Sequence, residues 1–273
     1  MNGFLFCVFI FYFCDCSRPS LQSLMNKYNT DKGYHHHYYL FYEPLFESIR
    51  DSPIRLLEIG VEGGRSMALW QEYFPNIDLL AGIGYGASFD IKSCVHKIRC
   101  FNGDQSDLNF LEKVIADTGG NFHIIIDDGS HVPMHQFVTL NRLLHTDAIV
   151  PNGIYIVEDV ETSYWRGNTE IYGYKINDGG LNAPCSFVER AKRFVDVINR
   201  EFVNSNYHTT KDRIDHRIST IQFSHNIIIF RIATDSEILL MDRHYRGANS
   251  VDFVSENKTQ KISNMCDMLS KSE

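Results

Sequence analysis

The sequence lacks several features that mark common classes of protein. It has no long block of basic residues, no internal repeat and no low-complexity segment. The formal net charge is −8 at pH 7 with histidine neutral, whereas domains that bind nucleic acid usually carry a basic patch. We therefore expect no nucleic-acid partner. Since 44% of the 273 residues are hydrophobic, the chain can bury the core of one large domain.

Metal-binding cysteine motifs are also missing. The seven cysteines include no CxxC pair, so we expect neither a zinc site nor a dense disulfide framework. Three consecutive histidines occur within Tyr34–Tyr39. Consecutive side chains of a regular element point in different directions and do not converge on one ion, so we interpret these histidines as part of a loop.

No apolar run reaches the length of a membrane span, which is about 20 residues. The longest run, Phe4 to Cys14, is typical of the apolar region of a secretory signal peptide. The basic residues that usually precede such a region are absent, which leaves a membrane-associated tail or a misassigned start as alternatives. We expect residues 1–17 to be a signal peptide or an anchor, with weak membrane association through residues 4–14. The expected location is the secretory pathway or a membrane surface, or the cytoplasm if this segment is neither.

Strand-like and helix-like patterns alternate along the rest of the chain. This alternation predicts an α/β fold: a Rossmann-like, doubly wound and mostly parallel sheet with an antiparallel C-terminal edge strand. We divide the chain into a helical lead-in (18–52), a main domain (53–235) and a tail (236–273). The predicted strands lie at 54–61, 78–85, 96–104, 122–128, 153–160, 218–224 and 226–233, and the predicted helices at 20–33, 38–50, 65–74, 106–119, 134–149 and 186–203.

The segment from Tyr164 to Pro184 is rich in glycine and aromatic residues and has no predicted secondary structure. Loops of this length are uncommon unless they have a function. We expect the segment to be a lid over a binding site. Tyr164 and Trp165 are candidates for stacking on a substrate, with buried packing as the alternative.

The segment EIGVEGGRS, residues 58–66, joins a predicted strand to a predicted helix. Its glycines, Gly60, Gly63 and Gly64, let the backbone approach a ligand closely, and the helix N-terminus adds a partial positive charge. Their spacing is not GxGxxG, which disfavours a nicotinamide or flavin cofactor. An acid just before such glycines, here Glu58, meets a nucleotide-like methyl donor in many class I methyltransferases. A tight turn with no ligand is the alternative.

A second polar segment, NGDQSD, follows the third predicted strand. Asp104 or Gln105 is a candidate for contacting an adenine edge. The alternative is a turn and a helix cap, because Asp and Ser favour such positions. Ser106 is our predicted N-cap for the following helix.

Two consecutive strands end in carboxylates, in IIIDDGSH and IYIVEDVETSYW. If these strands are close neighbours, Asp128, Glu158 and Asp159 converge and repel one another. A divalent cation removes that conflict, and all-oxygen ligands favour Mg²⁺, Mn²⁺ or Ca²⁺. His131 lies beside this site and is suited to remove a proton from a bound hydroxyl, since imidazole titrates near neutral pH. Helix capping by the acids is the alternative, and His135 either supports His131 or lies on a helix surface.

The order of these motifs resembles that of one family. The similar segments extend from about Ser23 to about Ile232, and the paired DDGSH and VEDVETSYW segments are the specific part. The family is the metal-dependent sugar O-methyltransferases of macrolide biosynthesis, the macrocin and mycinamicin O-methyltransferases. The similar segments are LMNKYNTDKG, RLLEIGVEGGRSMALWQEYFP, CFNGDQSD, FHIIIDDGSH and IYIVEDVETSYW.

The resemblance implies a methyltransferase domain at 53–235 that uses S-adenosylmethionine and Mg²⁺, or another divalent cation such as Mn²⁺, to methylate a hydroxyl of a sugar-like small molecule. It implies that Asp128, Glu158 and Asp159 bind the metal and that His131 is the catalytic base. It leaves open the oligomeric state and the acceptor, for which a glycoside is one candidate. The residues predicted to hold the methyl donor are Glu58, Gly60, Gly63, Gly64, Ser66, Asp104, Gln105 and Asp127, with ordering of the turn as the alternative for Asp127.

One position departs from the family pattern. The second strand typically ends in an acid that binds the ribose hydroxyls of the donor, and here that position is Gly84. Losing such a contact costs about 1.5–3 kcal/mol, and Asp90 is a candidate substitute. A noncatalytic methyltransferase-like binding protein with a weakened donor site is therefore one alternative function. A catechol-type O-methyltransferase, which needs the same metal, is another.

Overall fold

The computed structural model describes residues 18–86, 98–167, 169–199 and 217–238. The leader predicted at 1–17, the candidate substitute Asp90 and nearly all of the tail at 236–273 lie outside these residues and stay predictions. None of the helices within the described ranges combines the length and apolar character that crossing a bilayer requires.

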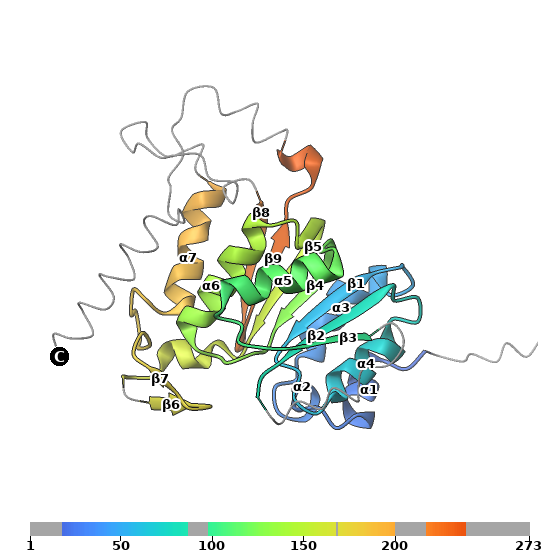
Figure 1. Ribbon diagram of the computed structural model, residues 1–273, viewed down its shortest axis with the longest axis horizontal. Coiled ribbons are helices and arrows are strands. Elements are labelled where there is room, and N and C mark those ends of the chain that lie inside the picture. Colours follow the sequence, from blue (N-terminus) through green and yellow to red (C-terminus); the bar gives the residue numbers. More distant parts are fainter. Residues whose placement is uncertain (1–17, 87–97, 168, 200–216, 239–273) are drawn as a thin grey trace, which may run out of the picture.

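A seven-stranded sheet forms the centre of the molecule (Figure 1). Its strand order is β3-β2-β1-β4-β5-β9-β8, in which the first five strands are parallel neighbours. β9 pairs antiparallel with both β5 and β8. The predicted Rossmann-like sheet is therefore confirmed, with its antiparallel strand one position in from the edge. The strands are β1 (Arg55–Ile59), β2 (Leu79–Gly84), β3 (Ile98–Asn102), β4 (Phe122–Asp127), β5 (Ile149–Glu158), β8 (Ile218–Ser224) and β9 (Ile227–Ile232).

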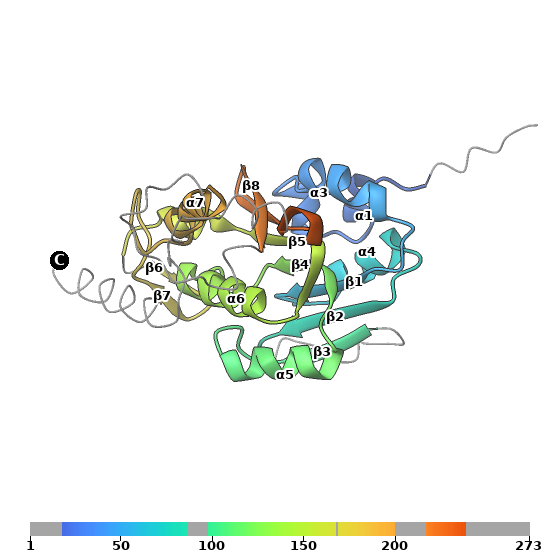
Figure 2. The same ribbon diagram turned by 90° about the horizontal axis from the view of Figure 1, so that it is seen from above.

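Helices cover both faces of the sheet (Figure 2). Successive strand residues face opposite sides, so Leu56 and Ile124 pack under α1, α3 and α4, whereas Leu57 and Ile125 pack under α5, α6 and α7. The two hydrophobic clusters hold the ends of the parallel strands in register. The helices are α1 (Leu21–Lys27), α3 (Tyr39–Phe46), α4 (Arg65–Tyr73), α5 (Leu108–Thr118), α6 (Pro133–His145) and α7 (Phe187–Ile198).

The lead-in packs directly against the sheet. Tyr42 and Phe46 of α3 are fully buried and contact Trp70 of α4. The helix predicted over 20–33 is instead two helices, α1 and the short α2 (Asp31–Tyr34), and the 3-10 helix η1 (Glu47–Ile49) follows α3. The break arises at Asn29, whose positive φ of 51° ends the first helix.

Three local expectations were wrong or incomplete. The 3-10 helix η3 (Val160–Tyr164) ends where the segment 164–184 begins, and the segment contains a hairpin of β6 (Thr169–Ile171) and β7 (Tyr174–Ile176). Asp107, not Ser106, caps α5, because the Asp107 carboxylate accepts from two helix N–H groups while the Ser106 hydroxyl donates to Asp104. Cys100 and Cys185 each take part in a disulfide bond, which the spacing of the cysteines did not indicate.

The ends of β1 and β4 meet at Gly60. Its φ is +99°, and a Cβ atom there would lie 1.7 Å from the carbonyl oxygen of Asp128. The Asp128 N–H donates to the Ile59 carbonyl at 2.8 Å, which holds the two strand ends together. Gly60 is therefore required by the backbone packing beneath the site.

Gly60→Ala is expected to lower the free energy of unfolding by about 3 kcal/mol or more, because it combines backbone strain with a backbone clash. Gly63→Ala is the matched control: a Cβ atom there meets nothing within 4 Å, and the change should stay within about 1 kcal/mol. Urea denaturation measures both. Equal stability of the two variants would show that the strand ends do not need glycine.

Candidate active site

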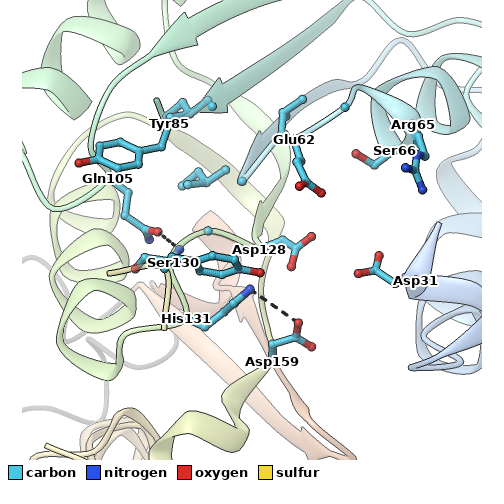
Figure 3. Close-up of a pocket in the computed structure, with 18 of the residues that line it drawn as sticks. Asp31, Glu62, Arg65, Ser66, Tyr85, Gln105, Asp128, Ser130, His131 and Asp159 are labelled. Atoms are coloured by element: carbon cyan, nitrogen blue, oxygen red, sulfur yellow. Dashed lines mark hydrogen bonds and ion pairs between the residues drawn. The ribbon is translucent and has the colours of Figure 1, made fainter. Parts of the chain in front are cut away.

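A pocket of 650 Å³ lies at the carboxyl ends of the parallel strands (Figure 3). Ile59 ends β1 and Gly84 ends β2, while Asp128 and Asp159 come directly after β4 and β5. The strand order reverses between β1 and β4, and ligands of open α/β sheets bind at such a reversal. The volume is in the range of small-molecule sites.

Most of the residues predicted to hold a methyl donor line this pocket. Glu58 and Asp127 do not line it and are fully buried. The predicted donor residues that line the pocket are Gly60, Gly63, Gly64, Ser66, Asp104 and Gln105.

Glu58 contacts the protein interior. Its Oε2 accepts a hydrogen bond from the Trp70 indole at 3.2 Å, and its Oε1 lies 3.4 Å from the Lys32 ammonium. Burial raises the pKa of Glu58, and Lys32 counteracts this. Glu58 thus connects the glycine segment to α4 and α2.

Gln105 and Asp127 together hold the loop that follows β4. The Gln105 amide donates to both Asp127 oxygens at 3.0 and 3.2 Å, and its Oε1 accepts from the Ser130 N–H at 2.6 Å. Burial raises the pKa of Asp127 to about 6. Both side chains therefore fix the backbone that carries Asp128 and His131.

Asp104 connects the pocket floor to the β6–β7 hairpin. Its carboxylate accepts from the Ser106 N–H at 2.8 Å and from the Tyr174 hydroxyl at 3.0 Å. His135 lies on the same side: its Nδ1 is 2.9 Å from the Ser130 hydroxyl, and its ring contacts Tyr174. His135 is thus a support of the loop and the hairpin.

Asp128, His131 and Asp159 form the most compact group of metal-ligating side chains in the described residues. One ligand atom from each lies within 4.8 Å of the others, and Figure 3 shows the three side chains pointing toward one another. Nδ1 of His131 is buried and has no hydrogen-bond partner. Two oxygen ligands and one imidazole are a donor set that divalent cations accept.

His131 and Asp159 both adopt left-handed backbone conformations, with φ values of 57° and 53°. Such conformations are costly outside glycine and gather at functional sites. The Thr162 hydroxyl donates to the His131 carbonyl at 2.5 Å. The surrounding structure thus holds both residues in place.

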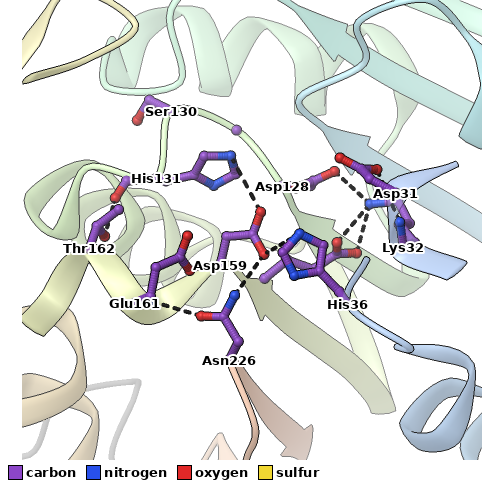
Figure 4. A network of polar contacts seen from close by, with 12 residues as sticks. Asp31, Lys32, His36, Asp128, Ser130, His131, Asp159, Glu161, Thr162 and Asn226 are labelled. Carbon is purple, nitrogen blue, oxygen red and sulfur yellow. Dashed lines mark hydrogen bonds and ion pairs between the residues drawn. The ribbon is translucent and has the colours of Figure 1, made fainter. Parts of the chain in front are cut away.

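Asp159 has the most extensive polar contacts (Figure 4). Its Oδ1 accepts from the Tyr38 hydroxyl at 2.5 Å and from the Asn226 amide at 3.0 Å. His36 Nε2 lies 3.5 Å from the same oxygen, and His131 Nε2 lies 3.8 Å from Oδ2. The β8–β9 turn and the residue before α3 therefore orient this carboxylate.

Glu158 has a different environment from Asp128 and Asp159. It is 1% exposed and does not line the pocket. Both of its oxygens lie 2.8 Å from the Lys32 ammonium, and the Tyr42 hydroxyl donates to Oε1 at 2.5 Å. Lys32 also lies 2.5 Å from Asp128. Burial lowers the pKa of Lys32, but Asp128, Glu158 and Glu58 raise it well above its usual value.

Sequence reasoning missed the side chains that the lead-in and the β8–β9 turn bring to the site. The three consecutive histidines lie in the turn between α2 and α3, as predicted, and one of them, His36, also contacts Asp159. No local signal in the sequence indicated that these residues reach the strand ends. The missed residues are Lys32, His36, Tyr38, Tyr42 and Asn226.

No protein-family model matches the chain. The chain is 32% identical to the mycinamicin VI 2''-O-methyltransferase of Micromonospora griseorubida over 228 residues, which are 78% of this chain and 53% of that protein. It is 30% identical to the 8-demethyl-8-alpha-L-rhamnosyl tetracenomycin-C 2'-O-methyltransferase of Streptomyces olivaceus over 218 residues, 77% of this chain and 53% of that one. The chain thus spans about half the length of these curated relatives.

A solved structure agrees with these sequence relatives. The MycE methyltransferase from the mycinamycin biosynthetic pathway, in complex with Mg and SAH, matches with a TM-score of 0.69 and 27% identity. The match covers 80% of this chain and 54% of that one. The chain therefore has the class I methyltransferase fold. The resemblance carried by its motifs is confirmed: it is related to the metal-dependent sugar O-methyltransferases.

Asp127→Asn is expected to remove part of the pH dependence of stability in the metal-free protein. The pKa of Asp127 is about 6, whereas it is about 3.9 in an unfolded chain. The folded state therefore binds this proton more tightly than the unfolded chain does. Asp127 contributes about 3 kcal/mol to the free energy of unfolding below about pH 4, and this contribution is lost as the pH rises through the folded pKa.

Denaturation of the wild type and the variant in chelator, at a series of pH values, measures this effect. The difference in stability between the two proteins should change by about 3 kcal/mol between about pH 4 and about pH 7.5. A constant difference would contradict the raised pKa.

Proposed function

We propose that this chain is an S-adenosylmethionine-dependent and divalent-metal-dependent O-methyltransferase that acts on a hydroxyl of a sugar-like small molecule. The observation that carries the proposal is the group Asp128, His131 and Asp159, which lies in one pocket with the glycine segment Gly60–Gly64. The relatedness to sugar O-methyltransferases supports it.

Asp128, Glu158 and Asp159 are the proposed metal ligands, with Mg²⁺ or Mn²⁺ as the cation. Asp128 and Asp159 line the pocket, and their oxygens suit these cations. Glu158 joins them in this proposal once its contact with Lys32 is released. The bound cation would supply Lewis acidity that makes a substrate hydroxyl more acidic, and S-adenosylmethionine would supply the methyl group.

His131 is the proposed general base. Its Nε2 is on the side of Asp159, which orients the ring, and Thr162 fixes its backbone. In the proposed step, His131 accepts the proton of the acceptor hydroxyl. The oxygen then attacks the methyl group in line, the bond between that methyl group and the sulfonium breaks, and S-adenosylhomocysteine leaves. The chain otherwise contributes positioning and exclusion of water.

The part of the pocket proposed to bind S-adenosylmethionine lacks one expected contact. Gly84 lines it, so the end of β2 supplies no side-chain acceptor for the ribose hydroxyls of the donor. This observation favours the second candidate function, a noncatalytic binding protein on the same fold. Asp104 and Ser66 are the polar side chains from the predicted donor set that remain in the pocket without being fully buried.

The β6–β7 hairpin is the proposed acceptor side. Tyr172 at its turn is 73% exposed and has a positive φ of 49°, and its ring lies 5.8 Å from that of His131. A large aromatic ring in this strained position gains little from the protein alone. Tyr172 is therefore suited to stack on the face of a bound sugar, whereas Tyr164 and Trp165 do not line the pocket.

Calorimetric titration of the full chain with S-adenosylmethionine, with and without Mg²⁺, tests the proposal directly. We expect micromolar binding, which corresponds to about −8 kcal/mol. Asp128→Ala should lose Mn²⁺ binding, whereas His131→Ala should keep the cation and the donor and lose about 100-fold or more in methyl transfer to a glycoside acceptor.

No donor binding at about 1 mM, in a protein that folds and binds Mn²⁺, would favour the noncatalytic candidate. Loss of Mn²⁺ binding in His131→Ala would instead identify the imidazole as a ligand. Normal turnover in that variant would refute its role as the base.

Tyr172→Asn tests the acceptor side. Asparagine tolerates a positive φ, so stability should be equal or higher, while KM for the glycoside acceptor should rise about tenfold through the loss of stacking. Tyr172→Phe should retain the wild-type KM. Tyr164→Asn is the matched control, since Tyr164 is 49% exposed and does not line the pocket. Equal effects at the two positions would remove Tyr172 from the acceptor site.

A further inference from the structure

The ammonium group of Lys32 is buried among carboxylates that lie at or next to the ends of three different strands. Its side chain is 3% exposed. Glu58 belongs to β1, Asp128 follows β4, and Glu158 ends β5. The lysine itself comes from α2, a helix of four residues in the lead-in. A single cation from a distant part of the sequence thus neutralises charge at the centre of the sheet edge.

The contacts of this ammonium are those expected of a bound cation. It lies 2.8 Å from both oxygens of Glu158 and 2.5 Å from Oδ2 of Asp128, with Glu58 at 3.4 Å. The same carboxylates would hold a divalent cation, which takes oxygen ligands. Figure 4 shows the Lys32 ammonium facing Asp128.

The Lys32 ammonium and a divalent cation would compete for these oxygens. Asp128 belongs both to the contacts of Lys32 and to the compact group with His131 and Asp159. An ammonium beside a divalent cation would repel it strongly in a site with little water. Glu158 is also unable to bind a metal while both of its oxygens face Lys32.

We propose that Lys32 is a resident counter-ion: it occupies the cation position between Asp128 and Glu158 in the metal-free protein and moves away when a divalent cation binds. The inference rests on the proposed metal-dependent function and adds a competitor built into the chain. Lys32 lines the pocket, so its ammonium has a route into water. Displacement frees Glu158 to join Asp128 and Asp159.

The competition also defines the apo state. Without a cation of either kind, Glu58, Asp128 and Glu158 repel one another in a buried environment. The lysine therefore allows the site to stay folded before the metal arrives. The consequence is that removing Lys32 makes stability depend on the metal.

The test compares Lys32→Met in the full chain with Lys27→Met as the matched control. Lys27 belongs to the same lead-in, but it pairs with Glu72 at the surface and is 55% exposed. Electron paramagnetic resonance of free Mn²⁺ measures the affinity. We expect Lys32→Met to bind Mn²⁺ about tenfold tighter or more and Lys27→Met to bind as the wild type does.

Thermal unfolding gives a second readout. In chelator, the melting temperature of Lys32→Met should be lower than that of the wild type. Saturating Mn²⁺ should remove this difference in melting temperature. If the wild type binds Mn²⁺ and Lys32→Met binds it equally or more weakly, the counter-ion role is overturned while the metal-dependent function stands. If the wild type binds no Mn²⁺, both proposals fail.

A third measurement covers the case in which Lys32→Met does not fold. In the wild type labelled with ¹⁵N-lysine, a buried ammonium exchanges slowly with water and gives its own resonance. Saturating Mg²⁺ should abolish that protected resonance. Its persistence with Mg²⁺ bound would overturn the proposal.

Discussion

The repulsion among buried carboxylates is the constraint on which the rest of this structure depends. Parallel strands bring their carboxyl ends to one edge of the sheet, and three neighbouring strands here carry acids at or next to those ends. Charges that are removed from water need partners in the protein. The lead-in helices, the β8–β9 turn and the loop after β4 all supply hydrogen-bond donors to this edge. The fold around the pocket follows from the need to pair these carboxylates.

The hydrogen-bond donors that contact each acid separate the acids into two groups with different roles. Trp70 and Lys32 bind Glu58, and Gln105 binds Asp127, so these two acids hold the framework together. Asp128 and Asp159 remain partly open to the pocket, with side chains 19% and 13% exposed. The carboxylates most suited to bind a ligand are thus those whose neighbours leave an oxygen accessible.

The periodicity of the sequence predicted the sheet well, because buried parallel strands leave uninterrupted apolar runs and their ends are where polar residues appear. It therefore placed Asp128, Asp159 and His131 at one edge. It did not predict the partners of these residues, since a lysine in TDKG or a tyrosine in YYLFYE contacts the site only through tertiary packing. It also did not predict that Glu58 and Asp127 are fully buried and lie outside the pocket lining, because position at a strand end does not tell whether a side chain faces the pocket or the interior.

The position of α2 and α3 has a consequence for where the functional unit begins. Tyr38 and Tyr42 donate to the two acids at the end of β5, Asp159 and Glu158, although both tyrosines precede the first strand in the sequence. The segment before residue 52 is therefore one wall of the site in the same sense as the loops at the strand ends. A fragment that starts at the first strand would keep the strands of the sheet but would expose the acids at its edge. The smallest part of the chain that can form this site is therefore larger than the sheet.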